Sequence, residues 1–113
     1  MRDIKHPVDV SGGIEVGGFL WDVDGSRKAG LQVARNSNLA ECKMDEGKIS
    51  IDTNWPPVRV SESFLHEVIH AVSNIYLHSS LKERDVSVLS YGLHQVMESL
   101  GVRFVFKTQK GKE

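Results

Sequence analysis

The sequence predicts a single α+β domain, in which an N-terminal antiparallel sheet packs on two helices and a short strand completes the fold. Two observations carry this prediction. The first half of the 113-residue chain contains short alternating segments separated by turn residues, and the second half contains two long segments with helical periodicity. A chain of this length builds one modest core and not two. We therefore expect residues 1–113 to form one domain.

Two short strands are expected near the N-terminus, at residues 4–10 and 15–23. Pro7 breaks the first strand, because proline offers no N–H to a ladder. Gly17 and Gly18 interrupt the second, which indicates a bulge or a close approach of another part of the backbone.

Asp24 and Gly25 favour a tight hairpin turn, since Asp-Gly sequences supply the positive φ that such turns require. Residues 31–34 are then the expected returning strand. Ala29 and Ala34 leave a short helix possible in the same place.

A clearer hairpin is predicted from residues 39–44 and 48–52, which alternate on both sides of the turn residues 45–47. The alternation gives this sheet one dry side and one polar side. The dry side contains Ala40, Cys42, Met44, Ile49 and Ile51.

Two helices are expected in the second half of the chain. Ser61 is a suitable N-cap, and a helix is predicted from about 61 to 78. The second is predicted from about 83 to 100 and ends at Gly101, before a last strand at 102–106 and a polar tail. Its expected apolar stripe is Val86, Leu89, Leu93, Val96, Met97 and Leu100.

Charge and cysteine content exclude several classes of function. The net charge is −1 with both signs interspersed, so we expect neither nucleic acid nor a membrane as a partner. The N-terminal region has no apolar core segment and no run approaches the length of a membrane span, so we expect a cytoplasmic protein. Cys42 is the only cysteine, which excludes an internal disulfide and a zinc site built from several cysteines of this chain.

The first predicted helix contains the pattern His-Glu-x-x-His at His66, Glu67 and His70. Residues four apart stack on one helical face, so the two imidazoles can bind one metal ion, while Glu67 stands about 100° round the helix. This arrangement suits zinc and a base that activates water. Both histidines border the predicted apolar arc of the helix, where a buried-edge site facing a cleft is expected.

A catalytic zinc ion needs a third protein ligand and an open position for water. Ser73 and Tyr76 stand where the extended metzincin pattern needs glycine and histidine, so that subclass is excluded. A carboxylate from the second helix remains, and Glu83 is the preferred candidate, with Asp85 as the alternative. His78 and His94 are weaker candidates, because His78 lies near a helix end and His94 lies about three turns beyond Glu83.

Two alternatives to catalysis remain open. The chain can bind zinc for a regulatory or interaction role without hydrolysing peptides. It can also bind no metal at all, with His66 and His70 simply hydrogen-bonded at the edge of the core.

The segments at 64–71, 81–86 and 89–97 (FLHEVIHA, LKERDV and LSYGLHQVM) resemble the small HExxH proteins of phages and prophages. These are similar to minimal zincin metallopeptidases and distantly similar to the metallopeptidase domain of the ImmA/IrrE group, which cleaves repressors. The resemblance implies a zincin-like fold, a Zn²⁺ cofactor and a peptide or protein substrate. It also implies His66, His70 and Glu83 as ligands, Glu67 as the catalytic base and, as the alternative, a non-catalytic zinc-binding phage protein.

The function predicted from the motif is zinc-dependent hydrolysis of peptide bonds. Zinc activates water and polarises the scissile carbonyl, and Glu67 accepts the proton and delivers it to the leaving amine. Tyr91 is conceivable as an oxyanion donor, although its helical position favours the surface. An edge strand of the sheet is expected to bind extended substrate by strand addition.

Overall fold

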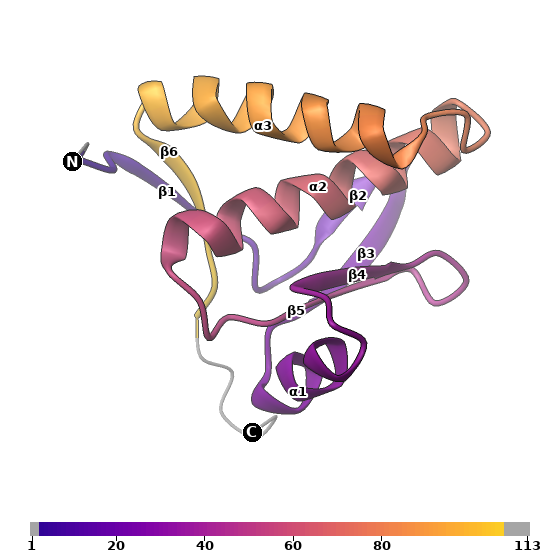
Figure 1. Ribbon diagram of the computed structural model, residues 1–113, viewed down its shortest axis with the longest axis horizontal. Coiled ribbons are helices and arrows are strands. Elements are labelled where there is room, and N and C mark those ends of the chain that lie inside the picture. Colours follow the sequence, from indigo (N-terminus) through magenta and orange to yellow (C-terminus); the bar gives the residue numbers. More distant parts are fainter. Residues whose placement is uncertain (1–2, 108–113) are drawn as a thin grey trace.

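The computed structural model describes residues 3–107, which contain three helices and two sheets of a small α+β domain (Figure 1). The predicted α+β class is therefore confirmed, while most of the polar tail lies outside the described residues. None of the helices in the described part is long and apolar enough to cross a membrane. The elements are β1 (His6–Asp9), β2 (Ile14–Val16), β3 (Phe19–Asp24), α1 (Arg27–Arg35), β4 (Ala40–Lys43), β5 (Lys48–Ile51), α2 (Pro57–Tyr76), α3 (Glu83–Ser99) and β6 (Val102–Val105).

The larger sheet has four strands in the order β2-β3-β5-β4. Its outer pairs, β2 with β3 and β4 with β5, are antiparallel, but the central pair of β3 and β5 is parallel. The prediction of a purely antiparallel sheet was wrong at this central pair. Because helix α1 crosses over between β3 and β4, the chain re-enters the sheet at its edge and β5 runs in the same direction as β3.

The first predicted strand belongs to a different sheet. β1 pairs in parallel with β6, in a register that joins His6 to Val102 and Asp9 to Val105. Segments from the two ends of the described chain thus lie side by side (Figure 1). Sequence patterns do not reveal such a pairing, since it joins residues far apart in the chain.

Gly17 and Gly18 form a tight turn between β2 and β3 rather than a bulge within one strand. Their φ angles are 63° and 80°, which a two-residue turn of this hand requires. The close neighbour is a side chain and not another backbone segment, because a Cβ atom on Gly17 would lie 2.5 Å from Cγ2 of Ile75 on α2. Glycine is thus needed here for both its backbone conformation and its size.

The hairpin predicted at Asp24 and Gly25 was wrong, and so was the returning strand at 31–34. Ser26 instead caps α1, since its Oγ accepts a hydrogen bond of 3.2 Å from the N–H of Ala29. The alternative of a short helix, left open by the sequence, is the correct one. Gly30 lets this helix lie close to the backbone at Asp52.

The hairpin formed by β4 and β5 is confirmed, with Cys42 opposite Ile49 and Ala40 opposite Ile51. Ile49 and Ile51 are fully buried, as predicted. The polar side of the sheet was predicted to be open, but Ser50 on that side is also buried. Helix α1 contacts β5 there, so the sheet is covered on both faces (Figure 1).

Helix α2 begins at Pro57 and not at Ser61, and it ends at Tyr76. Proline is well suited to a first helical position, because its fixed φ is helical and its missing N–H would have had no partner there. The predicted N-cap, Ser61, lies inside the helix and is fully buried.

Helix α3 was predicted with nearly correct ends, and Gly101 follows it with a φ of 74°. Its predicted apolar stripe was wrong at four positions, because Leu89, Leu93, Val96 and Leu100 are 42–64% exposed. The buried positions are Val86, Ser90 and His94. At 100° per residue, this face is rotated by about 90° from the exposed leucines.

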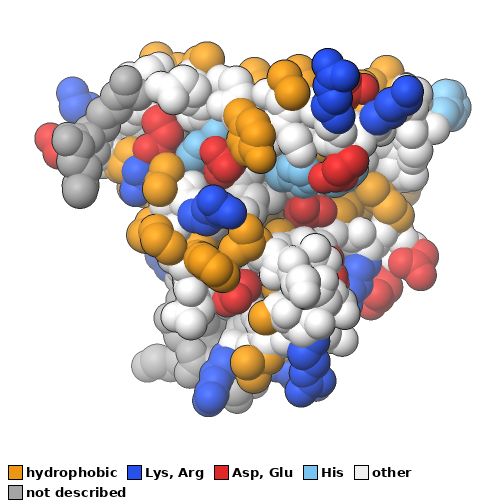
Figure 2. Space-filling model, viewed as in Figure 1, with side chains coloured by type: hydrophobic (Ala, Val, Ile, Leu, Met, Phe, Trp, Pro, Cys, Tyr) orange, Lys and Arg blue, Asp and Glu red, His pale blue; other side chains and the backbone are white. Residues whose placement is uncertain are grey.

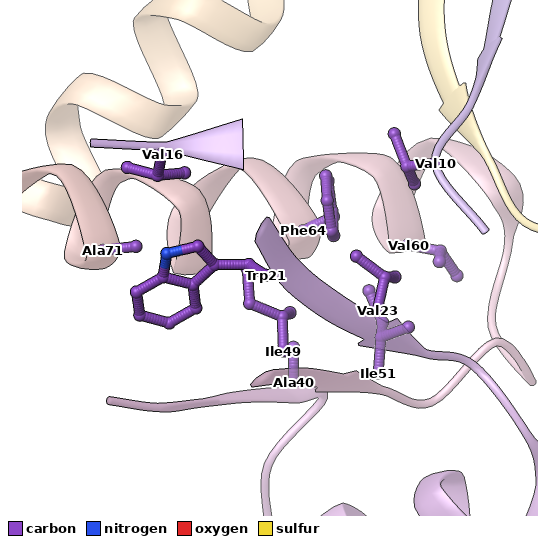
Figure 3. Packing of buried hydrophobic residues seen from close by; sticks show 10 residues of the cluster. All are labelled: Val10, Val16, Trp21, Val23, Ala40, Ile49, Ile51, Val60, Phe64 and Ala71. Carbon is purple, nitrogen blue, oxygen red and sulfur yellow. The ribbon is translucent and has the colours of Figure 1, made fainter. Parts of the chain in front are cut away.

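The main core lies between the four-stranded sheet and α2 (Figure 3). Phe64 is at its centre, fully buried, with edge-to-face contacts to Phe104 and Phe106 at centroid distances of 5.0 and 5.3 Å. This packing fixes the rotation of α2 and so determines which of its residues face outwards. The labelled core residues are Val10, Val16, Trp21, Val23, Ala40, Ile49, Ile51, Val60, Phe64 and Ala71.

Candidate metal centre

Helix α2 presents His66, Glu67 and His70 on a half-buried face, while Leu65 and Ile69 are buried. The position of the histidines at the margin of the apolar arc agrees with the prediction. Their rings are in edge-to-face contact, with centroids 4.9 Å apart. Both imidazoles are therefore held near one point in space.

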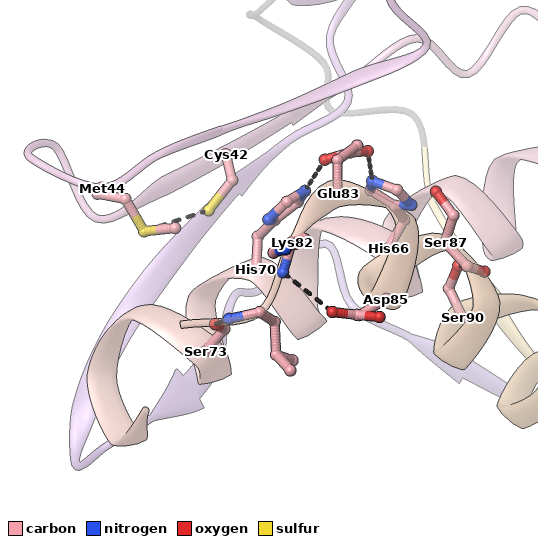
Figure 4. Close-up of polar contacts among 11 residues, drawn as sticks. Cys42, Met44, His66, His70, Ser73, Lys82, Glu83, Asp85, Ser87 and Ser90 are labelled. Atoms are coloured by element: carbon pink, nitrogen blue, oxygen red, sulfur yellow. Dashed lines mark hydrogen bonds and ion pairs between the residues drawn. The ribbon is translucent and has the colours of Figure 1, made fainter. Parts of the chain in front are cut away.

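Glu83, the first residue of α3, reaches both histidines (Figure 4). One of its carboxylate oxygens lies 2.6 Å from Nε2 of His66 and the other lies 2.8 Å from Nε2 of His70. Ligand atoms of the three residues all lie within 4.8 Å of one another. The side chain of Glu83 is 68% exposed, so the carboxylate can adjust its position without disturbing the core.

Asp85, the alternative carboxylate, is engaged elsewhere. It accepts a hydrogen bond of 3.3 Å from the backbone N–H of Lys82 at the start of α3. His94 is buried and bonded to Ser61, and His78 lies exposed beyond the end of α2. Among the described residues, the group that combines three donors close enough for one metal ion is His66, His70 and Glu83.

Glu67 is half-buried against β4, where the backbone N–H of Cys42 donates a hydrogen bond to its carboxylate. Burial, together with the negative charges of Glu83 and Glu41, raises the pKa of Glu67 to about 8, against the lowering effect of the hydrogen bond from Cys42. A carboxyl group with a pKa in this range can both take and return a proton near neutral pH.

Cys42 shares this environment but has a different character. Burial raises the pKa of its thiol to about 12, with a further contribution from the charge of Glu67. The thiol is therefore protonated at neutral pH and is a poor metal ligand or nucleophile in this state. Cys42 contributes to the site through its backbone N–H, which bonds with Glu67, and not through its sulfur.

The candidate site opens into a groove of about 860 Å³ between β4 and the two long helices. On the face shown in Figure 2, histidine and acidic side chains gather in the hollow where the helices meet the hairpin. β4 is an outer strand of its sheet, so one of its edges has no strand partner among residues 3–107. The lining includes Asn38, Arg59, Ser63, His66, Glu67, His70, Glu83 and Tyr91.

Two features of the groove were missed or undervalued from the sequence. Tyr91 lies on the surface as expected, 59% exposed, and it also lines the groove, which the sequence did not indicate. The contact between Cys42 and Glu67 has no signature in the sequence, because it depends on how β4 packs against α2. The alternation of the hairpin did indicate that Cys42 faces the helices.

The donor set fits a zinc ion. Two imidazole nitrogens and one carboxylate are typical ligands of catalytic zinc sites, which leave a further position open. Nε2 of His66 and Nε2 of His70 both face the carboxylate of Glu83, so the two nitrogens point to the place that a shared metal ion would take. A neutral imidazole nitrogen that carries no proton is a metal donor.

Comparisons of the chain with models of protein families, with curated proteins and with solved structures find no match. Inferences about function therefore come from the side chains of this site and their geometry.

Proposed function

We propose that this protein is a zinc-dependent metallopeptidase with a zincin-like active site. His66, His70 and Glu83 hold the zinc ion, and Glu67 is the general base. The observation that carries this proposal is the Glu83 carboxylate, which meets Nε2 of both motif histidines at 2.6 and 2.8 Å. This contact supports the proposal because it brings a carboxylate from a second helix to the point where the two motif histidines meet.

A zinc ion held by these side chains would supply Lewis acidity to a water molecule and to a peptide carbonyl. Glu67 takes a proton from the attacking water and returns it to the amine that leaves. The N–H of Cys42 holds the Glu67 carboxylate in place between these two transfers. The raised pKa of Glu67 makes its carboxylate a stronger base and so favours the uptake of the proton from water.

The free edge of β4 gives the groove a means of binding peptide. An extended segment can pair with this edge, because an outer strand offers N–H and C=O groups with no strand partner. The bound backbone would then pass in front of His66, Glu67 and His70, which line the same groove. We infer peptides or flexible protein segments as substrates, in the cytoplasm, as the resemblance to phage-type and ImmA/IrrE proteins also implies.

Metal analysis tests the zinc part of this proposal. Protein exposed to zinc and then dialysed is expected to retain one zinc ion per chain, and the His66→Ala variant is expected to lose it. His6→Ala is a matched control, because His6 is exposed on β1, outside the candidate group. Equal and near-zero zinc in the wild type and in His66→Ala would end the proposal.

The Glu67→Gln variant separates an enzyme from a non-catalytic zinc-binding protein. It keeps all three ligands and is expected to bind zinc while losing cleavage of unfolded protein substrates by about 100-fold or more. Equal cleavage by wild type and variant would show that Glu67 is not the base. Normal zinc content without cleavage in the wild type would favour the regulatory or interaction role.

A further inference from the structure

Arg59 lies on the α2 face that lines the groove, together with Ser63, His66 and His70. These residues are spaced four, three and four apart, so they form one continuous row along the helix. Arg59 is exposed and makes no ion pair with any residue in the 3–107 range that the structure describes. The groove therefore has a cation available at the end away from Glu83.

Two acidic residues, Glu41 and Glu62, also line the groove near this end. The carboxylate of Glu41 accepts hydrogen bonds from the side-chain amides of Asn36 and Asn38, at 2.8 and 2.9 Å. Glu62 lies close enough to His94 to affect its protonation. Arg59 is thus the group in this part of the groove with unused hydrogen-bonding capacity for an anion.

The direction of β4 determines which part of a peptide would meet Arg59. The C=O of Leu39, just before β4, accepts a hydrogen bond from the N–H of Asp52, which lies shortly before the start of α2. Further along β4, the backbone of Cys42 contacts Glu67, which lies further along α2. β4 therefore runs in the same direction as α2. A peptide paired antiparallel to β4, the more stable arrangement, has its C-terminal part directed towards Arg59.

The distance along the groove sets the position of the contact. Seven residues separate Arg59 from His66, which corresponds to about 10 Å along a helix. An extended peptide covers this distance in about three residues. The contact would thus fall about three residues beyond the bond at the metal centre.

We propose that Arg59 makes the groove selective for peptides with a carboxylate about three residues C-terminal to the scissile bond. This inference rests on the proposed function, since it takes the metal centre as the point of cleavage. The carboxylate can be an Asp or Glu side chain or the free C-terminus of a short substrate. A guanidinium binds either one through paired N–H groups.

Binding experiments test this selectivity without requiring turnover. The probes are fluorescein-labelled hexapeptides of alanine and phenylalanine, with a free C-terminal carboxylate, with a C-terminal amide, or as the amide with Glu at each position in turn. Fluorescence anisotropy is measured with the zinc-loaded Glu67→Gln protein, so that the probes stay intact. The free-acid probe or one Glu-containing amide is expected to bind about tenfold more tightly than the plain amide.

Arg59→Gln, introduced into the same protein, is expected to abolish this advantage while leaving the affinity for the plain amide unchanged. Lys43→Gln is the matched control, because Lys43 is a cation at the other end of the groove lining, and it is expected to keep the advantage. An advantage that survives Arg59→Gln, or that Lys43→Gln removes equally, would overturn the assignment. So would equal binding of the acid, amide and Glu-containing probes.

Cleavage of a random peptide mixture by the active protein shows how many residues separate the cleaved bond from the preferred carboxylate. Acidic residues or a free C-terminus are expected about three residues beyond the cut, and Arg59→Glu is expected to shift the preference to Lys and Arg. Cleavage with no such preference would contradict the Arg59 proposal alone. Absence of zinc or of cleavage would contradict the proposed function, while the anisotropy results would still decide the role of Arg59.

Discussion

Ser61 on α2 and His94 on α3 share a buried hydrogen bond of 2.8 Å between the serine hydroxyl and Nε2 of the histidine. Ser61 Oγ also accepts a hydrogen bond of 3.0 Å from the N–H of Phe104. The hydroxyl proton is therefore available to an unprotonated Nε2. One serine thus joins α2, α3 and the segment that contains β6.

This hydrogen bond and the packing of Val86 against Leu65 and Ile69 together account for the rotation of α3. His94 and Glu83 are eleven residues apart, which places them on nearly the same side of a helix. When His94 turns towards α2, Glu83 turns towards His66 and His70 at the other end of the antiparallel pair. With the leucine stripe against α2 instead, Glu83 would point away from both histidines.

The rotation of α3 can be tested with two valines of the same helix. Val86 is fully buried and Val96 is 55% exposed, although the sequence predicted both in one stripe. Val86→Ala is expected to lower the free energy of unfolding by about 2 kcal/mol, and Val96→Ala by less than about 0.5 kcal/mol. Urea unfolding measures both. Equal losses would mean that the leucine stripe faces the core.

Removal of the Ser61 hydroxyl is expected to destabilise the domain. Ser61→Ala leaves both the N–H of Phe104 and the ring of His94 without this partner. The free energy of unfolding is expected to fall by about 1–3 kcal/mol. Ser63→Ala is a matched control, since Ser63 is only half-buried and lines the groove, and it is expected to have little effect on unfolding. A loss no larger than that of the control would contradict the role of Ser61.

The buried His94 predicts a dependence of stability on pH. Burial lowers its pKa, helped by the charge of Arg103 on β6 and opposed by Glu98 on α3 and Glu62 on α2. As the pH falls, His94 is therefore protonated near pH 6.5 in the unfolded chain, but only at a lower pH in the folded chain. The contribution of neutral His94 is complete above that pH and is lost as the pH falls towards the lowered pKa.

Urea unfolding at a series of pH values between about 8 and 5 checks this dependence. The difference in the free energy of unfolding between the wild type and the His94→Gln variant is expected to shift in favour of the variant as the pH falls below about 6.5, because only the wild type loses the contribution of neutral His94. The raised pKa of Glu67 has the opposite effect on stability, but it acts in both proteins and cancels in this difference. Parallel curves for the two proteins would show that His94 is not the responsible group.

The two carboxylates at the start of α3 are expected to differ in their effect on zinc binding. Glu83 contacts both motif histidines, whereas Asp85 bonds with the N–H of Lys82. Glu83→Gln is expected to weaken zinc binding by about 100-fold or more, because it removes a charged ligand. Asp85→Asn should leave zinc affinity nearly unchanged and reduce stability by less than about 1 kcal/mol. Competition with a chromogenic chelator measures both, and a larger loss for Asp85→Asn would reverse the assignment.

The parts of the fold that follow from local pattern were predictable. The hairpin of β4 and β5 alternates, and α2 and α3 have helical periodicity, so their existence and approximate ends follow from residues close together in the chain. The His-Glu-x-x-His spacing similarly places His66 and His70 together on one helical face.

The incorrect predictions concern features of the fold that depend on tertiary packing. Ser61 looks like a helix cap, but the helix already begins at Pro57 and Ser61 serves a buried contact. The leucines of α3 look like a core stripe, but Ser90 and His94 take that place. The pairing of β1 with β6 joins the two ends of the described chain. None of these arrangements can be inferred from residues near in sequence.

The most direct test of the metal centre is a crystal structure of the protein soaked in zinc, with anomalous scattering recorded on both sides of the zinc absorption edge. The account predicts one strong anomalous peak, about 2.0–2.2 Å from Nε2 of His66, Nε2 of His70 and a carboxylate oxygen of Glu83. A peak bound by other residues, or no peak within reach of these three side chains, would contradict it.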